Sequence, residues 1–441
     1  MILRRFFSKA VREAIALRKH VMRQFHAQRD LMTPLAVSSV QEKVNELDAA
    51  IKDDSNTGKI RIKAEELQFA GEKWIKPYPN PAFRENVEVL LVAIAVAMGI
   101  RTFFLQPFKI PTASMQPTLY GITSAPDFTQ VTAMLESNGG DFNSPPVQAA
   151  AAAQVAVLNS IVIPSGFERV KEWLRGYSYI HFVAPADGSV EDVKPPWPGT
   201  FISLSQKIEF AGQWYTIFLP PDCGEEPLQW RSGLMLARGR VYHKGDDVIK
   251  LRVHAGDHLF VDRFTYNFRA PQRGEIVVFQ TAGIPEDQRD MWRIAPDQFY
   301  IKRLVGLGGE TISLQRDYDV ADSPLPGGGI GPLPAGHLVV NGQPLSASTP
   351  HFENLYSFYG AKPGTNTLVY REDEYYGHAM VQRLAPGDEV HIAPGNSFMM
   401  GDNTMNSLDS RYWGDIPSSS IIGKSFFVYW PLTRRFGLNG Q

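Results

Sequence analysis

The chain contains very little cysteine: Cys223 is the single one among 441 residues. One thiol cannot close an intramolecular disulfide, so cysteine usage neither demands nor excludes an oxidising compartment, and we interpret Cys223 as a buried structural thiol. Net charge is also nearly absent, because 44 basic and 46 acidic side chains leave a formal charge of -2. Such a chain has no overall field that attracts nucleic acid. We therefore expect no nucleic-acid partner.

Several signatures of hydrolytic enzymes are missing as well. The sequence contains no G-x-S-x-G elbow and no K-T-G, which argues against α/β hydrolases and penicillin-binding enzymes. Its ten histidines lack the H-E-x-x-H spacing, so a zinc peptidase has little support. Segment 402–414 resembles a calcium loop, but it carries Ser407 and Trp413 where such a loop needs glycine and glutamate. We exclude calcium there.

Only one segment is strongly apolar. From Val87 to Leu105 it reads VEVLLVAIAVAMGIRTFFL, and about 19 residues at about 1.5 Å each match the hydrocarbon thickness of a bilayer. Its two charges, Glu88 and Arg101, lie near the ends, where long side chains can reach the headgroups. We predict a transmembrane helix over 86–105, and the alternative is a buried helix of a soluble core. The flanking cations only weakly favour a cytoplasmic N-terminus.

The chain before the apolar segment differs from the chain after it. Residues 1–85 are charged and mostly helical in pattern, and their amphipathic start, 1–20, suits either an anionic membrane surface or an ordinary solvated helix. After the segment, β-branched or alternating runs predict strands at 258–262, 275–279 and 424–430. Because glycine and proline punctuate these runs, we predict an antiparallel, barrel-like β fold.

Three separated segments carry side chains suited to acyl transfer. Ser114 lies in IPTASMQPTL (110–119), shortly after the apolar segment. A serine hydroxyl is a poor nucleophile unless a base lies within hydrogen-bond reach. Lys302 is the candidate base if burial lowers its pKa, and strand alternation would place it on the same side as Tyr300 and Leu304. The ordinary alternative is a snorkelling or salt-bridged lysine.

Together with Met400–Gly414, these segments resemble the bacterial type I signal peptidases, also called leader peptidases, which are serine peptidases of the S26 family. The resemblance implies that Ser114 is the nucleophile, that Lys302 is the general base and that the Ser407 hydroxyl orients the lysine amine. It covers three parts of the chain, which are 87–120, 256–312 and 386–432.

The resemblance also assigns supporting residues. Asp409 and Arg411 match the charged pair that braces the serine segment of the family. Thr112 stands where the family usually has a serine whose hydroxyl joins the Ser114 amide in the oxyanion hole. Ala113 stands where glycine is common, which excludes a positive φ there.

The implied substrate is the signal sequence of an exported preprotein, cleaved after small residues. An extended peptide can add along exposed strand edges, and small pockets would reject large side chains. By family analogy, the walls of these pockets are Ile110, Met115, Leu119, Tyr300 and Ile301. The resemblance implies no metal and no organic cofactor, and the expected partners are preproteins and the lipid bilayer.

We therefore predict a mainly β, single-pass membrane peptidase with its catalytic domain on the outer face of a bacterial inner membrane. The predicted parts are a cytoplasmic helical region 1–85, the span 86–105, a core built from 106–120, 251–312 and 386–432, an inserted domain 121–250 and a second insertion 313–385.

Two alternatives stay open. A self-cleaving Ser/Lys repressor-type peptidase shares the dyad chemistry, but it should carry a DNA-binding helix pair and an internal Ala-Gly cleavage site. A catalytically silent membrane scaffold would retain the peptidase core as a relic. The presence of Ser114, Lys302, Ser407 and Thr112 together favours an active enzyme.

Overall fold

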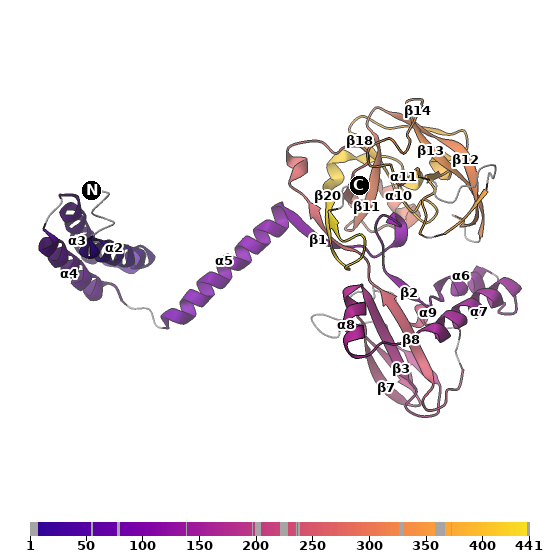
Figure 1. The fold of residues 1–441 in the computed structure, drawn as a ribbon, viewed down its shortest axis with the longest axis horizontal. Helices are drawn as coiled ribbons and strands as arrows, with labels where there is room; N and C mark the ends of the chain where they lie inside the picture. The colour runs from indigo at the N-terminus through magenta and orange to yellow at the C-terminus, as the bar shows by residue number, and fades with distance from the viewer. Residues whose placement is uncertain are drawn as a thin grey trace. The chain divides into compact units, whose positions relative to one another are not determined.

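The structure is a computed structural model, and its chain divides into two compact units, Met1–Val96 and Ala97–Gln441 (Figure 1). It describes residues 8–53, 56–76, 80–137, 139–195, 197–198, 204–220, 228–234, 236, 239–325, 330–357, 367–371 and 373–438. Cys223, and the first seven residues of the predicted amphipathic start, lie outside these ranges.

The first unit begins with three packed helices, which confirms the helical N-terminal region. These are α2 (Lys9–Gln28), α3 (Pro34–Lys52) and α4 (Thr57–Trp74), with a short 3-10 turn at Arg29–Leu31. Thr33 caps α3 by accepting a hydrogen bond from the Ala36 amide. The apolar side chains of α2, including Val11 and Phe25, are buried in the core of this bundle. The described part of the amphipathic start thus packs against protein.

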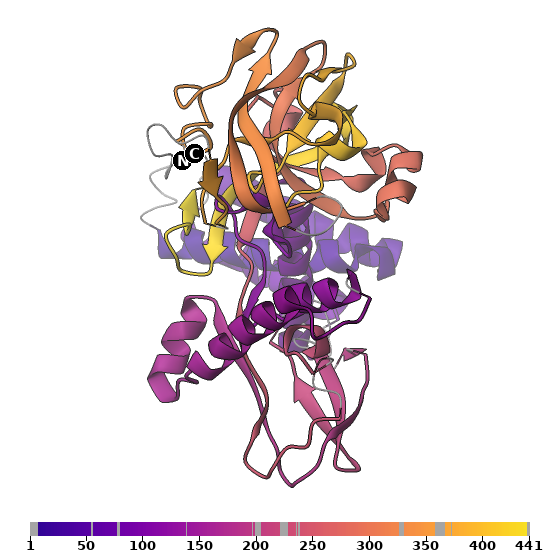
Figure 2. The same ribbon diagram turned by 90° about the vertical axis from the view of Figure 1, so that its right-hand side faces the viewer.

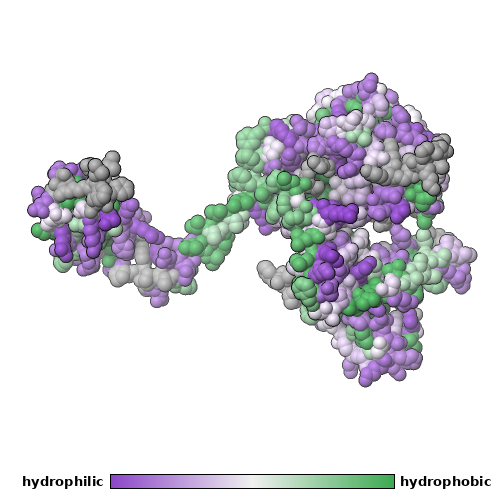
Figure 3. Space-filling view, viewed as in Figure 1, coloured by the Kyte–Doolittle hydropathy of each residue, from purple (hydrophilic) through white to green (hydrophobic). Residues whose placement is uncertain are grey.

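Helix α5 (Pro81–Phe103) contains the predicted apolar segment. Its stretch Phe83–Phe103 is long and apolar enough to cross a membrane, with a mean hydropathy of 1.7, and 0% of the apolar window is buried in the protein. Figure 3 shows hydrophobic surface along this helix. An unburied apolar helix is unlike the buried helix of a soluble core, so the structure argues against that alternative. Leu105 already lies in strand β1.

The core of the second unit is a curled antiparallel sheet with the strand order β1-β9-β20-β10-β11-β18-β19, and β21 pairs with β20. Its strands are β1 (Leu105–Lys109), β9 (His258–Asp262), β10 (Ile276–Gln280), β11 (Phe299–Leu307), β18 (Asn396–Met400), β19 (Ile416–Pro417), β20 (Ile421–Trp430) and β21 (Gly437–Leu438). The predicted strands at 258–262, 275–279 and 424–430 are confirmed as β9, β10 and β20. Register shifts in β10 and β11 increase the local twist, which curls the sheet.

A second sheet follows β11 along the chain. Its strands are β12 (Thr311–Pro324), β13 (Ile330–Val340), β14 (Gln343–Pro344), β15 (Thr367–Val369), β16 (His378–Ala379) and β17 (Glu389–His391). Strands β12 and β13 form a long antiparallel ribbon, drawn in orange in Figure 2. Asn341 and Gly342, both at positive φ, make the tight turn from β13 to β14. All pairs are antiparallel among the described strands except β12 with β15.

The region between β1 and β9 has its own sheets and its own core. Its strands are β2 (Thr123–Ala125), β3 (Tyr177–Val183), β4 (Val190–Val193), β5 (Trp197–Pro198), β6 (Leu204–Phe210), β7 (Gln213–Phe218) and β8 (Asp247–His254). Its helices are α6 (Thr129–Ser137), α7 (Pro145–Ser160), α8 (Gly166–Leu174) and α9 (Leu228–Arg231). Residues 251–254 belong to β8, which pairs with β2 and β3. Two short helices outside this region, α10 (Glu286–Trp292) and α11 (Ser410–Trp413), complete the second unit.

Candidate active site

Ser114 lies on a single 3-10 turn, Ala113–Met115, shortly after β1. Two glycines let other backbone segments approach this turn closely. A Cβ at Gly121 would lie 2.2 Å from the Thr112 carbonyl oxygen, and one at Gly256 would lie 1.8 Å from the Ile110 carbonyl oxygen. No larger residue fits at these distances. The backbone at Gly121 and at Gly256 therefore packs directly against the segment that leads into Ser114.

Lys302 lies in β11, where it pairs with Val277 of β10. Its Nζ donates a hydrogen bond to Ser114 Oγ across 188 residues of sequence. Both side chains are buried, with relative exposures of 4% for Lys302 and 7% for Ser114. The structure thus brings the expected nucleophile and the expected base into direct contact.

The environment of Lys302 favours its neutral form. Burial lowers the pKa of Lys302 from its usual 10.5 to about 8. The negative charges of Asp409 and Asp402 act against this shift, and the positive charge of Arg411 adds to it. At a pKa of about 8, roughly a tenth of the amine is neutral at pH 7. A neutral amine beside a serine hydroxyl is able to accept the hydroxyl proton.

Thr112 and Asn403 border the serine turn. Thr112 Oγ1 lies 3.4 Å from Ser114 Oγ, beside the reacting atom. The Asn403 amide donates to the Ser114 carbonyl oxygen at 3.1 Å, and Asn403 Nδ2 donates to the Ala113 carbonyl oxygen at 3.1 Å. Ala113 is not among the residues with positive φ, so a methyl group is tolerated there.

Ser407 is buried beside the serine turn. A Cβ built at Gly401 would lie 2.2 Å from Ser407 Oγ and 2.4 Å from the Ser114 carbonyl oxygen, so Gly401 separates the two serine segments. Ser407 Oγ has no hydrogen-bond partner among the described residues. The expected hydrogen bond from Ser407 to Lys302 is therefore not formed in this structure, and the orienting role of Ser407 stays a prediction.

Asp409 and Arg411 form a fully buried ion pair with an Nη2 to Oδ2 distance of 2.8 Å. Burial alone would raise the pKa of Asp409, but the Arg411 charge and the hydrogen bonds to the carboxylate hold that pKa below its usual range. One of these hydrogen bonds comes from the Gly401 amide at 3.0 Å. Arg411 also donates to the carbonyl oxygens of Thr404, at 2.9 Å, and Ala379, at 3.1 Å. The pair thus links the loop after β18 to β16.

Sequence reasoning missed a second buried ion pair, between Arg303 and Asp402. Arg303 donates from Nε to Oδ1 at 2.7 Å and from Nη2 to Oδ2 at 2.6 Å. Thr118 also donates to this carboxylate, and the Tyr375 hydroxyl lies 3.0 Å from Thr118 Oγ1. The strand pattern around Arg303 could have predicted this pair. Arg303 lies on the same strand face as the apolar Ile301 and Val305, and a buried cation there needs a carboxylate partner.

The five expected pocket residues do not form one open wall. Ile110, Met115, Leu119 and Ile301 belong to one apolar cluster, and Met115 and Leu119 have no exposed surface. Tyr300 lies on the Lys302 side of β11, where its ring centroid is 6.0 Å from that of Trp413. Ile301 and Tyr300 keep partial exposure. Their assignment as pocket walls stays a prediction.

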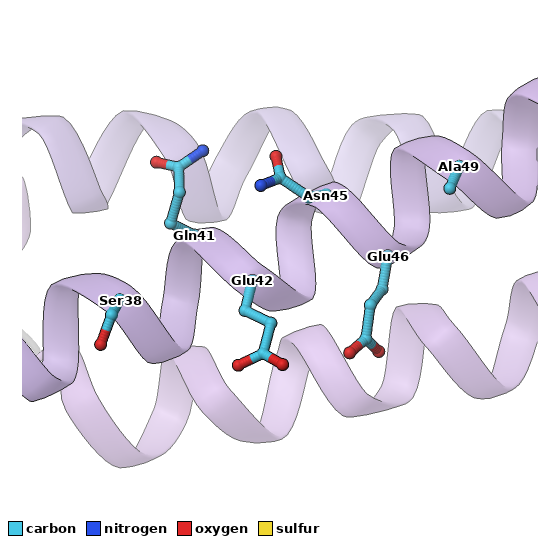
Figure 4. Close-up of a pocket in the computed structure, with 6 residues that line it drawn as sticks. All are labelled: Ser38, Gln41, Glu42, Asn45, Glu46 and Ala49. Carbon is cyan, nitrogen blue, oxygen red and sulfur yellow. The ribbon is translucent and has the colours of Figure 1, made fainter.

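A shallow surface groove lies on the N-terminal helices. It is lined by six residues, all from α3, as Figure 4 shows: Ser38, Gln41, Glu42, Asn45, Glu46 and Ala49. One helix face provides no second wall from which polar groups could converge on a ligand. In the described ranges, no group of three or more His, Cys, Asp or Glu side chains is placed to hold a metal ion.

A family model described as "Signal peptidase, peptidase S26" matches residues 83–125 and 249–430, about half of the chain. The chain belongs to this family. The match omits residues 126–248, which lie within the predicted inserted domain 121–250, and it runs through 313–385, the predicted second insertion.

Several curated signal peptidases I are similar to this chain. The relative from Leptolyngbya laminosa is 27% identical over 183 residues, covering 41% of this chain and 64% of the relative. The relative from Pseudomonas aeruginosa is 29% identical over 238 residues, covering 47% and 66%. The chain therefore spans a little under two thirds of these relatives. A crystal structure of a signal peptidase I from Enterococcus faecalis is 23% identical, covers 35% of this chain and 97% of its own, and has a TM-score of 0.20.

Proposed function

We propose that this protein is a membrane-anchored serine endopeptidase that removes N-terminal signal peptides from exported preproteins. The observation that carries the proposal is the buried hydrogen bond from Lys302 to Ser114, made by a lysine whose pKa is lowered to about 8 by burial. A buried lysine that served only packing or charge balance would not need a serine hydroxyl as the hydrogen-bond partner of its amine. Membership in the signal peptidase family and the names of its relatives support the same substrate class.

In the proposed reaction, neutral Lys302 takes the proton of Ser114 as Ser114 Oγ attacks the scissile carbonyl carbon. The Ser114 amide and the Thr112 hydroxyl stabilise the oxyanion. Lys302 then gives its proton to the leaving amine, which frees the mature protein and leaves the signal peptide as an ester on Ser114. Water, deprotonated by Lys302, hydrolyses this ester and regenerates the serine. Protons balance over the two steps, and no metal or organic cofactor is required.

The remaining buried groups have positioning roles in this proposal. Asn403 holds the serine turn through two hydrogen bonds. The Asp409–Arg411 pair holds the loop that carries Gly401 and Ser407. Ser407 Oγ, buried and without a partner among the described residues, is free to accept a hydrogen bond from the Lys302 amine once the proton has moved. Such a contact would keep the amine in line with the substrate.

The proposed substrate contacts follow from size and edge geometry. An extended segment adds its backbone to a strand edge near Ser114, and pockets bounded by the partly exposed Tyr300 and Ile301 leave room only for small side chains before the scissile bond. Helix α5 ends at Phe103 and Ser114 follows eleven positions later, so a membrane-spanning α5 brings the serine to the surface where signal peptides arrive. In this arrangement the protein crosses a bacterial inner membrane once, with the N-terminal unit in the cytoplasm and the catalytic core outside.

The relic scaffold is less well supported than the enzyme. A scaffold has no need of a buried lysine with a lowered pKa, which costs stability without improving packing. A self-cleaving repressor-type peptidase shares the dyad, but a candidate membrane span is foreign to it. Incubating the purified chain alone and looking for self-cleavage separates that class from a signal peptidase.

The deciding experiment is cleavage of a synthetic preprotein with an Ala-x-Ala junction, in detergent or lipid. We expect Ser114→Ala and Lys302→Met each to abolish cleavage, and the surface variants Ser348→Ala and Lys244→Met to retain it. Folding of every variant is verified by circular dichroism. Cleavage that persists in both active-site variants would show that the catalytic assignment is wrong. No cleavage by any form, including the unaltered chain, would favour the scaffold.

A further inference from the structure

Helix α8, between β1 and β9, presents an exposed apolar face. Its sequence GFERVKEWL places Phe167, Val170 and Trp173 three residues apart, which aligns them on one side of a helix. Their relative exposures are 79%, 52% and 52%, and no residue of α8 is buried. Soluble proteins seldom expose two aromatic side chains on one short helix without a partner for them.

The exposed apolar surface continues from α8 onto the end of the main sheet. The rings of Trp173 and Trp430 lie 6.1 Å apart, and the Leu432 amide donates to the Leu174 carbonyl oxygen at 2.9 Å. Leu432 and Phe436 are 48% and 47% exposed. The α8 patch is defined as Phe167, Val170, Trp173, Leu174, Trp430, Leu432 and Phe436.

Cations stand at the border of the α8 patch. Arg169 lies on α8 itself, and Arg434 lies between Leu432 and Phe436. Both are exposed, and neither forms an ion pair with any residue that the structure describes. An apolar face with tryptophan and phenylalanine is typical of helices that lie in the headgroup layer of a membrane. The charges of α8 itself are balanced, because Glu168 and Glu172 accompany Arg169 and Lys171. Arg169 and Arg434, which form no ion pair in the described part of the chain, are the groups that favour anionic lipid.

The chain connectivity keeps the α8 patch near the proposed membrane span. Strand β1 begins at Leu105, directly after α5, and its other end, Lys109, lies opposite His258, which in turn lies opposite Trp430. From Leu105 to Lys109 is four residue steps of about 3.3 Å along β1, and from β1 across β9 to β20 is two strand spacings of about 4.8 Å. Because these two directions are perpendicular, Trp430 lies roughly 16 Å from Leu105. The Trp173 ring adds 6.1 Å, so the Trp173 end of the patch lies within roughly 25 Å of the end of the span.

We propose that the α8 patch inserts into the headgroup layer of the same bilayer that α5 crosses, with anionic phospholipid as its ligand. The inference rests on the membrane anchoring in the proposed function. It gives the inserted region, which the family match omits, a role: a second point of membrane contact besides α5. Two contacts fix the tilt of the catalytic core, and with it the height of Ser114 above the lipid, where a single helix would leave the core free to rotate.

The test uses the full chain in vesicles of phosphatidylcholine and phosphatidylglycerol. In a Cys223→Ser background, which is first shown to cleave preprotein like the unaltered chain, three single-cysteine variants carry an NBD fluorophore: Val170→Cys on the α8 patch, Glu168→Cys on the opposite side of the same helix, and Val92→Cys in α5. We expect nitroxide-labelled lipids to reduce the NBD emission at positions 170 and 92 by about twofold. Emission at position 168 should change little.

The controls separate the two proposals. Quenching at position 92 without quenching at position 170 refutes the α8 contact and leaves the anchoring intact. Absence of quenching at both positions refutes the anchoring as well. A blue shift at position 170 that lipid nitroxides do not quench, and that grows with the protein-to-lipid ratio, identifies a second copy of the chain as the occupant and also overturns the inference. Omitting phosphatidylglycerol should weaken the quenching at position 170 and not at position 92.

Discussion

The protonation state of Lys302 determines a pH profile that can be calculated. Burial lowers the pKa of this side chain to about 8, and the reaction needs the neutral amine. The neutral fraction is about 1% at pH 6, about 9% at pH 7 and about 50% at pH 8. We therefore expect kcat/KM for preprotein cleavage to rise about fifty-fold between pH 6 and pH 8, with a slope of one on the acid side.

The assay is initial-rate cleavage of the Ala-x-Ala preprotein in buffers of constant ionic strength. Circular dichroism at each pH shows whether the fold persists, so that loss of structure is not mistaken for loss of the base. A rate that is already at its plateau at pH 6 would refute the reasoning, because a charged lysine cannot accept the serine proton. A midpoint near 10 would show that Lys302 is solvated, in conflict with its burial.

Four further outcomes are expected. Lys302→Met should raise the free energy of unfolding by up to about 3 kcal/mol at pH 7, from the pKa difference between 10.5 and about 8. Because the unfolded chain binds the Lys302 proton more tightly than the folded chain, this gain in stability is full below pH 8 and vanishes by about pH 10.5. Chemical denaturation at several pH values measures it. Gly401→Ala should lower kcat at least tenfold, since its methyl group meets the Ser114 carbonyl oxygen; normal turnover would mean that the loop yields. Tyr375→Phe removes the hydroxyl bound to Thr118 and should lower the free energy of unfolding by about 1 kcal/mol, measured by thermal unfolding. It should also reduce kcat more than it changes KM, and an unchanged kcat would limit Tyr375 to a structural role. Ser114→Cys should keep measurable cleavage, and its complete loss in folded protein would count against Ser114 as nucleophile.

Local sequence pattern was enough for much of the fold. The apolar segment, the helical start and three strands of the main sheet follow from periodicities that a few neighbouring residues determine.

The site was only partly predictable. Ser114 and Lys302 stand in short motifs, so each was identified from its own segment. Asp402 pairs with Arg303 across 99 positions, and it also accepts from Thr118 across 284. No local pattern encodes a contact between segments so far apart, because the chain must first fold to bring them together.

Helices α2 and α8 show the limit of what can be predicted from sequence alone. Residue spacing alone gives α2 and α8 each an apolar face, because side-chain spacing on a helix is a local property, although only the face in the amphipathic start 1–20 was predicted. Only the tertiary structure decided that Val11 and Phe25 of α2 are buried in a bundle while Phe167 and Trp173 of α8 stay exposed. The same holds for Lys302. The sequence was enough to predict it as the candidate base, but its lowered pKa depends on burial by strands that are distant in the chain.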